Sequence, residues 1–189
     1  DTLTEADRAL GDSDHGVGMA RGFEAVQGEL ANSTANDLGE LLRLIGTRLM
    51  MSVGGAAGAI YGTFFRSAGK NLAGVQVLDS GAIYLMLSDG MAGVQERGKS
   101  QVGDKTIVDV LSPAVEKAAE LQTVDLVESL EAVTEAAYEG MESTKNLVAT
   151  VGRAKTLGER SLGNPDPGAV SMYLILKSMS EYVGKMLNE

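Results

Sequence analysis

Asp7-Arg8-Ala9-Leu10-Gly11-Asp12-Ser13-Asp14-His15-Gly16 is the stretch around which the rest of the chain is organised. It holds three carboxylates and the only histidine of the 189-residue chain, with a glycine on either side of Asp12-Ser13-Asp14-His15. Three carboxylates held together repel, since a like-charge pair about 4 Å apart costs roughly 4 kcal/mol at an effective dielectric near 20. Unless the acids point apart, a cation must lie between them.

The ligand types in this stretch favour a hard divalent ion, because oxygen ligands suit Mg²⁺ or Ca²⁺ better than Zn²⁺. A calcium loop of the EF-hand type does not fit. Counted from Asp12, its fifth and twelfth positions fall on Gly16 and Phe23, which offer no side-chain ligand. Mg²⁺ fits better, since it takes few protein carboxylates and leaves positions for phosphate oxygens. The pattern therefore favours a magnesium site at Asp7, Asp12 and Asp14.

His15 follows this set directly and is open to several interpretations. It could form a local hydrogen bond, bind the metal, contact phosphate or carry a phosphoryl group itself. Its place behind two aspartates favours a phosphate contact.

The bulk composition predicts one globular domain over residues 1–189, with 44% hydrophobic and 22% charged residues and three prolines. A net charge of −10 argues against a nucleic-acid partner. No apolar run approaches the roughly 18–20 residues of a membrane span. The absence of cysteine fits a reducing compartment, and we expect a cytoplasmic protein. Because the chain starts without methionine and soon reaches the acidic stretch, we expect some N-terminal residues to precede Asp1.

Apolar residues recur with helical spacing in almost every long segment, and no convincing strand alternation is present. The sequence predicts an all-α bundle of about eight antiparallel helices. The expected helices are the tail of one over residues 2–9 and others over residues 17–30, 38–49, 58–65, 80–94, 107–118, 126–148 and 167–186. The expected capping residues are Asn36 or Asp37, Asp79 or Ser80, and Asp166.

An up-and-down path through these helices brings the loops together at two ends. The glycine-bearing loops at 54–58, 98–104 and 163–168 then lie at the same end as residues 11–18. The polar loops at 32–35, 70–79 and 122–124 lie at the other end. We therefore expect one site built from four loops.

Single motifs within these loops leave alternatives open. Residues 54–58, Gly-Gly-Ala-Ala-Gly, either offer free N–H groups to an anion at a helix start or allow two helices to pack closely. Asp104 in Gly103-Asp104-Lys105-Thr106 could simply cap a helix. Residues 93–100 match the G-x-x-x-x-G-K-[ST] pattern of a P-loop, but a helical stripe precedes them, so we expect no P-loop. Arg153 is either a surface residue or a phosphate partner.

Seven short motifs, taken together, resemble the L-subunit family of dihydroxyacetone kinases, in order and spacing, over almost the whole chain. They are residues 11–16, 52–56, 62–65, 97–99, 103–106, 158–161 and 166–169. The resemblance implies a barrel of eight antiparallel helices that binds a nucleotide, with most of the first helix preceding Asp1. It also implies phosphoryl transfer that works by positioning and charge neutralisation, with no certain catalytic side chain and His15 as a candidate.

The resemblance further implies two Mg²⁺ ions, held by Asp7, Asp12 and Asp14, which bridge the phosphates of ADP or ATP. Gly98 and Ile107 match positions beside the adenosine. The positions that match nucleotide contacts are His15, Gly16, Val17, Gly18, Ala56, Ala57, Gly98, Ile107, Arg153, Asp166, Pro167 and Gly168. Gly18, Ala57 and Ile107 depart from the residues common in the family, whereas the carboxylate set is intact.

The partners are implied in the same way. In the family a separate K subunit holds the sugar covalently, and in one variant a phosphotransferase-system M subunit rephosphorylates bound ADP. In the other variant ATP exchanges from solution; a stand-alone chain favours the first. An ATP-dependent kinase for dihydroxyacetone or another short ketose stays open, as does a phosphohistidine carrier using His15. A nucleotide-binding domain of a larger enzyme, as in fatty-acid kinases, and a non-catalytic module read by a regulator also stay open.

Overall fold

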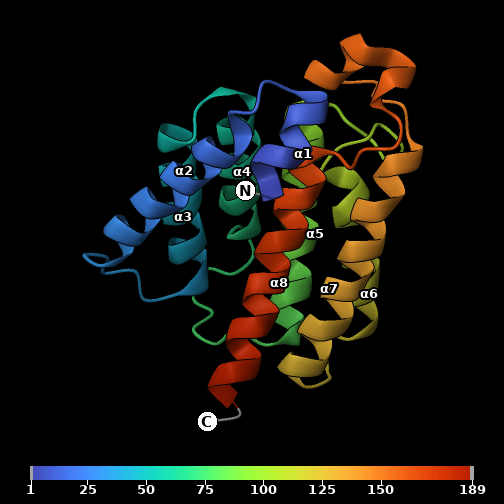
Figure 1. The fold of residues 1–189 in the computed structure, drawn as a ribbon. Coiled ribbons are helices and arrows are strands. Elements are labelled where there is room, and N and C mark those ends of the chain that lie inside the picture. The colour runs from blue at the N-terminus through green and yellow to red at the C-terminus, as the bar shows by residue number, and fades with distance from the viewer. Residues whose placement is uncertain (1, 188–189) are drawn as a thin grey trace.

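The computed structural model describes residues 2–187, which form eight α-helices and two 3₁₀ helices with no strand among them (Figure 1). The elements are α1 Thr2–Leu10, α2 His15–Leu30, α3 Leu38–Ser52, α4 Gly55–Ala68, α5 Ser80–Gly98, α6 Val108–Glu120, α7 Leu126–Ser143, η1 Thr144–Asn146, η2 Arg153–Ser161 and α8 Pro167–Leu187. The predicted all-α class and the number of α-helices are confirmed. None of the described helices is long and apolar enough to span a bilayer.

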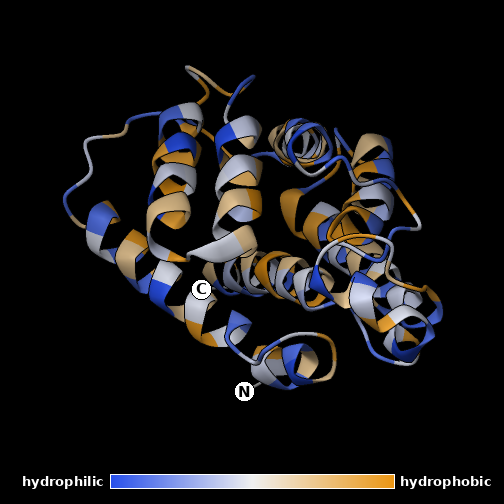
Figure 2. Cartoon of the chain, turned by 90° about the horizontal axis from the view of Figure 1, so that it is seen from above, coloured by the Kyte–Doolittle hydropathy of each residue, from blue (hydrophilic) through white to orange (hydrophobic). Residues whose placement is uncertain are grey.

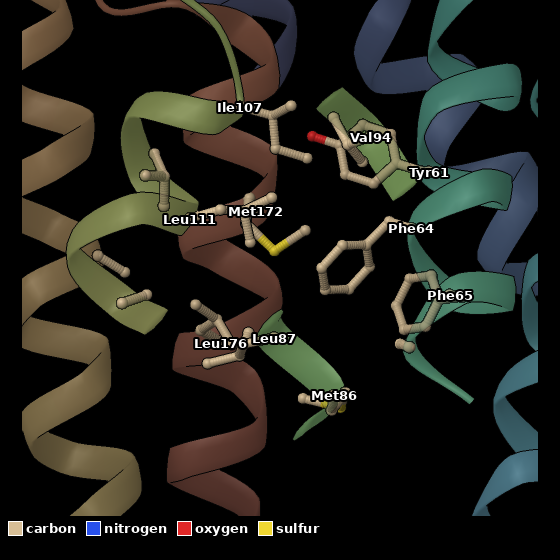
Figure 3. Close-up of a cluster of buried hydrophobic side chains, with 14 of the residues drawn as sticks. Tyr61, Phe64, Phe65, Met86, Leu87, Val94, Ile107, Leu111, Met172 and Leu176 are labelled. Carbon is tan, nitrogen blue, oxygen red and sulfur yellow. The ribbon is translucent and has the colours of Figure 1, made fainter. Parts of the chain in front are cut away.

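Each helix packs against the next one along the chain, and α1 packs against α8, so the eight helices form a closed ring (Figures 1 and 2). The hydrophobic core lies inside this ring. Figure 3 shows Tyr61 and Phe64 of α4 pointing toward Met172 of α8, and all three side chains are at most 1% exposed. Full burial of a large apolar side chain stabilises a fold by about 1.5–3 kcal/mol.

Helix starts differ between the two ends of the ring. At one end, α3, α5 and α7 begin after Asp37, Asp79 and Asp125. Each of these carboxylates accepts a hydrogen bond from a first-turn backbone N–H at 2.7–2.8 Å. At the opposite end, α2 and α4 begin with no side-chain cap. The uncapped N–H groups in the first turns of α2 and α4 are therefore available to a ligand at that end.

Several element boundaries differ from the prediction, and three of them bear on the site. Helix α2 begins at His15, two residues early, because the His15 backbone N–H donates to Asp7 Oδ2 at 3.1 Å. Helix α7 ends at Ser143 instead of reaching Val148, which is 37% exposed. The Thr144 hydroxyl donates to the Met141 carbonyl at 2.6 Å, and this side-chain bond accompanies the end of the helix. The segment expected as a loop from residue 152 to 166 contains η2.

Packing around the ring is uneven. Helices α3 and α4 approach closely where two glycines face each other, since a Cβ on Gly46 would lie 2.6 Å from the Gly62 carbonyl oxygen. Between α1, α2, α3, α5 and α8 the ring is looser and holds an apolar cavity of about 1200 Å³. Val17 and Phe23 of α2 line it and remain 64% and 36% exposed.

Candidate functional site

The loops expected to share one end of the bundle do so. The Arg153 guanidinium forms an ion pair with Asp12, and the Thr150 hydroxyl bonds to the Asp104 carboxylate. The α1–α2 loop and the segment 144–166 accordingly meet at the top of the ring in Figure 1. At the other end, the Ser80 hydroxyl donates to the Val124 carbonyl at 2.8 Å, which joins two of the polar loops.

The three carboxylates of the opening stretch converge. One oxygen from each of Asp7, Asp12 and Asp14 lies within 4.8 Å of the others. Asp7 is buried in α1, whereas Asp12 and Asp14 are exposed in the loop. Ser13 between them has a left-handed φ of 66°, a backbone conformation that residues other than glycine rarely adopt. Oxygen-only ligands at this spacing fit a hard divalent cation, as the sequence predicts.

His15 begins α2 beside this cluster, and its ring faces the first turn of α8. Its Nε2 lies 2.7 Å from the Ser171 hydroxyl. Burial lowers the pKa of His15, and the nearby charges of Asp7 and Asp14 and a hydrogen bond to the Pro167 backbone oppose this shift. A lowered pKa leaves the ring neutral at pH 7, so it would act toward phosphate as a hydrogen-bonding group and not as a cation.

The uncapped starts of α2 and α4 lie on the same side as the carboxylates. Gly54 and Gly55, with φ of 82° and 58°, form the turn into α4, and a Cβ on Gly55 would meet nothing within 4 Å. Close helix packing therefore does not explain Gly55. Ala56 is exposed and Ala57 partly buried in the first turn, where free N–H groups and the helix dipole favour an anion.

The opposite wall of the site is the start of α8. Asp166 caps this helix, as predicted, by accepting a hydrogen bond from the Ala169 N–H at 2.8 Å. Burial raises the pKa of Asp166 to about 6, against the lowering effects of that hydrogen bond and of Lys105. The Tyr61 hydroxyl donates to the Gly168 carbonyl at 2.6 Å, and a Cβ on Gly168 would lie 3.9 Å from the Ile107 nitrogen. The predicted positions 107 and 166–168 are therefore adjacent.

Residues 98–107 form a turn and not a P-loop. Helix α5 continues to Gly98, and Lys99 ends it with a left-handed φ of 54°. The suggestion that Asp104 caps the next helix is wrong. Its carboxylate accepts from the Gln101 N–H at 2.7 Å and bonds Thr150, while α6 begins after Ile107 without a side-chain cap. Asp109 holds the turn instead, accepting from the Thr106 N–H at 2.7 Å.

Four supporting residues escaped prediction. Arg21 donates to the carbonyls of Ser52 and Val53 at 2.8 and 2.7 Å and so fixes the turn before α4. The others are Ser171, Thr144 and Lys105, which is only 2% exposed. Their signal in the sequence is weak, because a lone Ser, Thr, Lys or Arg is common on helix surfaces. The one available hint was that Ser171 and Arg21 each lie one helical turn after a predicted site residue, Gly168 and Gly18 respectively.

The ring of helices gathers three carboxylates and two helix starts without a side-chain cap at one end. The chain belongs to the DAK2-domain family, whose sequence profile matches residues 9–181.

Similar proteins cover nearly the whole chain. The ADP-binding subunit DhaL of PEP-dependent dihydroxyacetone kinase from Escherichia coli K12 is 41% identical over 180 residues, 94% of this chain and 86% of that protein. The corresponding subunit of PTS-dependent dihydroxyacetone kinase from Lactococcus lactis is 36% identical, over 96% of this chain and 87% of that protein. The crystal structure of C. freundii dihydroxyacetone kinase with AMP-PNP and Mg²⁺ aligns with a TM-score of 0.72 at 28% identity. That alignment covers 96% of this chain but 30% of the larger chain.

Proposed function

We propose that this chain is the ADP-binding subunit of a dihydroxyacetone kinase that holds a magnesium nucleotide for phosphoryl transfer to dihydroxyacetone on a separate sugar-binding K subunit. Relatives of similar length are named as such subunits, and they are 36–41% identical over almost the entire chain. The terms PEP-dependent and PTS-dependent in those names support a phosphotransferase-system M subunit as the source of the phosphoryl group.

One observation carries the proposal. The N-terminus of α2, which favours an anion, starts directly beside the carboxylates of Asp7, Asp12 and Asp14. A phosphate placed there without a cation would face three negative charges, whereas bridging cations turn the same carboxylates into ligands. The arrangement therefore suits a metal-bound phosphate chain better than a free anion or a free metal.

The proposed roles follow from the positions of the residues. Asp7, Asp12 and Asp14 hold two Mg²⁺ ions, which supply charge neutralisation of the phosphates. The first turns of α2, at residues 15–18, and of α4, at Ala56 and Ala57, donate backbone N–H groups to phosphate oxygens. On the opposite side, Gly98 and Ile107 lie against the adenosine. Arg153 and residues 166–168 close the pocket.

The chain's own contribution to the reaction is positioning. Helix starts and carboxylates fix the phosphates in the site, and Arg153 adds a guanidinium whose fork suits phosphate oxygens. Ser171 orients the neutral ring of His15, which acts as a hydrogen-bonding group beside the phosphates. The hydroxyl that accepts the phosphoryl group belongs to dihydroxyacetone, which the K subunit holds.

Reconstitution tests this function. The purified chain is mixed with a sugar-binding K subunit and dihydroxyacetone, and product formation is followed with either ATP or a phosphorylated M subunit as donor. We expect dihydroxyacetone phosphate with the phosphorylated M subunit and a catalytic amount of ADP. Turnover with ATP alone would instead identify the exchanging type of kinase. Acid-labile phosphate on nucleotide-free protein, lost in His15→Ala, would contradict the proposal and identify a phosphohistidine carrier.

A further inference from the structure

Lys105 is the buried cation of the site region and has no role in the proposed chemistry. Its side chain is 2% exposed, and its backbone has a left-handed φ of 62°. Both features are costly. Burial removes the ammonium from water, and a residue with a side chain is strained in the left-handed backbone conformation. A residue that bears two such costs requires a specific reason.

The hydrogen bonds of Lys105 supply that reason. Its Nζ donates to the Thr144 carbonyl at 2.5 Å and to the Asn164 carbonyl at 2.6 Å. These two residues stand at the start and the end of the segment 144–164, which leaves the helical ring and carries Arg153 on η2. One ammonium therefore ties both ends of that segment to the turn 103–107.

Neighbouring contacts make the connection stiff. Asp109 accepts hydrogen bonds from the Gly103 and Thr106 N–H groups at 2.6 and 2.7 Å, which fixes the turn that bears Lys105. Thr144, in turn, accepts from the Asp166 N–H at 3.0 Å through its hydroxyl. Burial lowers the pKa of Lys105, whereas the charges of Asp166 and Asp109 raise it and so favour the ammonium.

We propose that Lys105 is a positioning residue, whose ammonium fixes the segment of Arg153 against the turn of Ile107. The inference rests on the proposed nucleotide site. It adds the residue that holds the segment 144–164 and the turn 103–107 together. Lys105 does not touch the nucleotide. Lys105 sets the distance between this segment and this turn. Loss of its ammonium therefore weakens nucleotide binding at a point where the helical ring is still folded.

The test compares Lys105→Met with two controls. Lys117→Met makes the same substitution at an exposed lysine near the far end of α6, where Lys117 pairs with Glu120. Leu130→Ala opens a cavity in α7 near the far end and lowers the melting temperature without touching the site. ADP affinity is measured by calorimetry at saturating Mg²⁺, well below every melting temperature, and hydrogen exchange is measured across residues 147–163.

We expect Lys105→Met to weaken ADP binding at least tenfold and to speed exchange across residues 147–163. Both controls should stay within twofold of the wild type in affinity. Two results would overturn the inference: an ADP affinity of Lys105→Met within twofold of wild type, or an equal loss in Leu130→Ala. If the methionine variant does not fold, Lys105→Gln, which keeps one donor group, takes its place with the same expectations. If the wild type itself does not bind Mg²⁺ and ADP, the proposed function is wrong. In that case, an unchanged hydrogen-exchange rate across residues 147–163 in the Lys105 variant would separately contradict the positioning role.

Discussion

The guanidinium of Arg153 forms an ion pair with the carboxylate of Asp12, so a predicted nucleotide contact and a predicted metal ligand bind each other. The two side chains are 67% and 47% exposed. Exposed ion pairs contribute only about 0.2–1 kcal/mol. Divalent ions and phosphate, which bind these groups more strongly, can therefore replace the pair at little cost.

This pairing predicts opposite effects of one substitution on two ligands. Arg153→Gln frees Asp12, so the affinity for Mg²⁺ alone should rise by up to about fivefold, the equivalent of roughly 1 kcal/mol. ADP affinity at saturating Mg²⁺ should fall, because a phosphate partner is lost. Calorimetry measures both. A decrease in Mg²⁺ affinity would show that the ion pair does not compete with the metal.

The single histidine gives a clean test of the site's electrostatics. Because burial lowers the pKa of His15, its ring should titrate below the ordinary value of about 6.5 and be neutral at pH 7. The unfolded chain takes up its proton first as the pH falls, so this residue should reduce stability below about pH 6.5. NMR of the only histidine ring reports the midpoint. A midpoint above 6.5 would mean that Asp7 and Asp14 outweigh burial.

Asp166 predicts a pH dependence of the opposite sign. Its folded pKa of about 6 lies above the 3.8 of an ordinary aspartate. Between these values the unfolded chain loses the proton first, so the stability contribution of Asp166 is present below about pH 4 and disappears as the pH rises to 6. The difference of about two pKa units sets an upper limit of about 3 kcal/mol for the change, and the partial solvent exposure of Asp166 reduces it. The wild type should therefore lose stability relative to Asp166→Asn across this range in urea titrations, and parallel curves would refute the raised pKa.

The close contact of α3 and α4 predicts different effects for two glycine substitutions. In Gly46→Ala the new Cβ would meet backbone atoms of α4 at 2.6 Å, so we expect destabilisation by roughly 1–3 kcal/mol. Gly28→Ala in α2 meets nothing within 4 Å, and there alanine should stabilise by about 0.5–1 kcal/mol. Thermal unfolding of the two variants decides the matter, and equal effects would exclude tight α3–α4 packing as the cause.

The sequence was informative about the helices because apolar spacing and capping residues act locally. Asp37 and Asp79 cap α3 and α5 as predicted. The end of α7 was missed because apolar residues keep helical spacing as far as Val148, although the helix ends at Ser143. Beyond that end, the Thr144 hydroxyl accepts from the Asp166 N–H, a partner distant in sequence. The 3₁₀ helix at Arg153 likewise has a polar composition that is typical of a loop.

The site shows the same division. The convergence of Asp7, Asp12 and Asp14 was predictable because they lie within eight residues of each other. The supporting contacts were not, because Lys105 and Ser171 act on residues that other segments bring to them. Asp104 shows the corresponding error, since a local cap was the simplest interpretation of a residue that in fact bonds Thr150.

The melting temperature with ADP, measured with Mg²⁺ and again with EDTA, tests the central claim most directly. Ligand at about 100 times its dissociation constant stabilises a protein by about 2.7 kcal/mol, which corresponds to a rise of roughly 5–10 °C for a chain of this size. We predict this rise for the wild type with Mg²⁺, no rise with EDTA, and no rise for Asp14→Asn under either condition. An ADP-induced rise that persists in EDTA or in Asp14→Asn would contradict a nucleotide held through metal ions on these carboxylates.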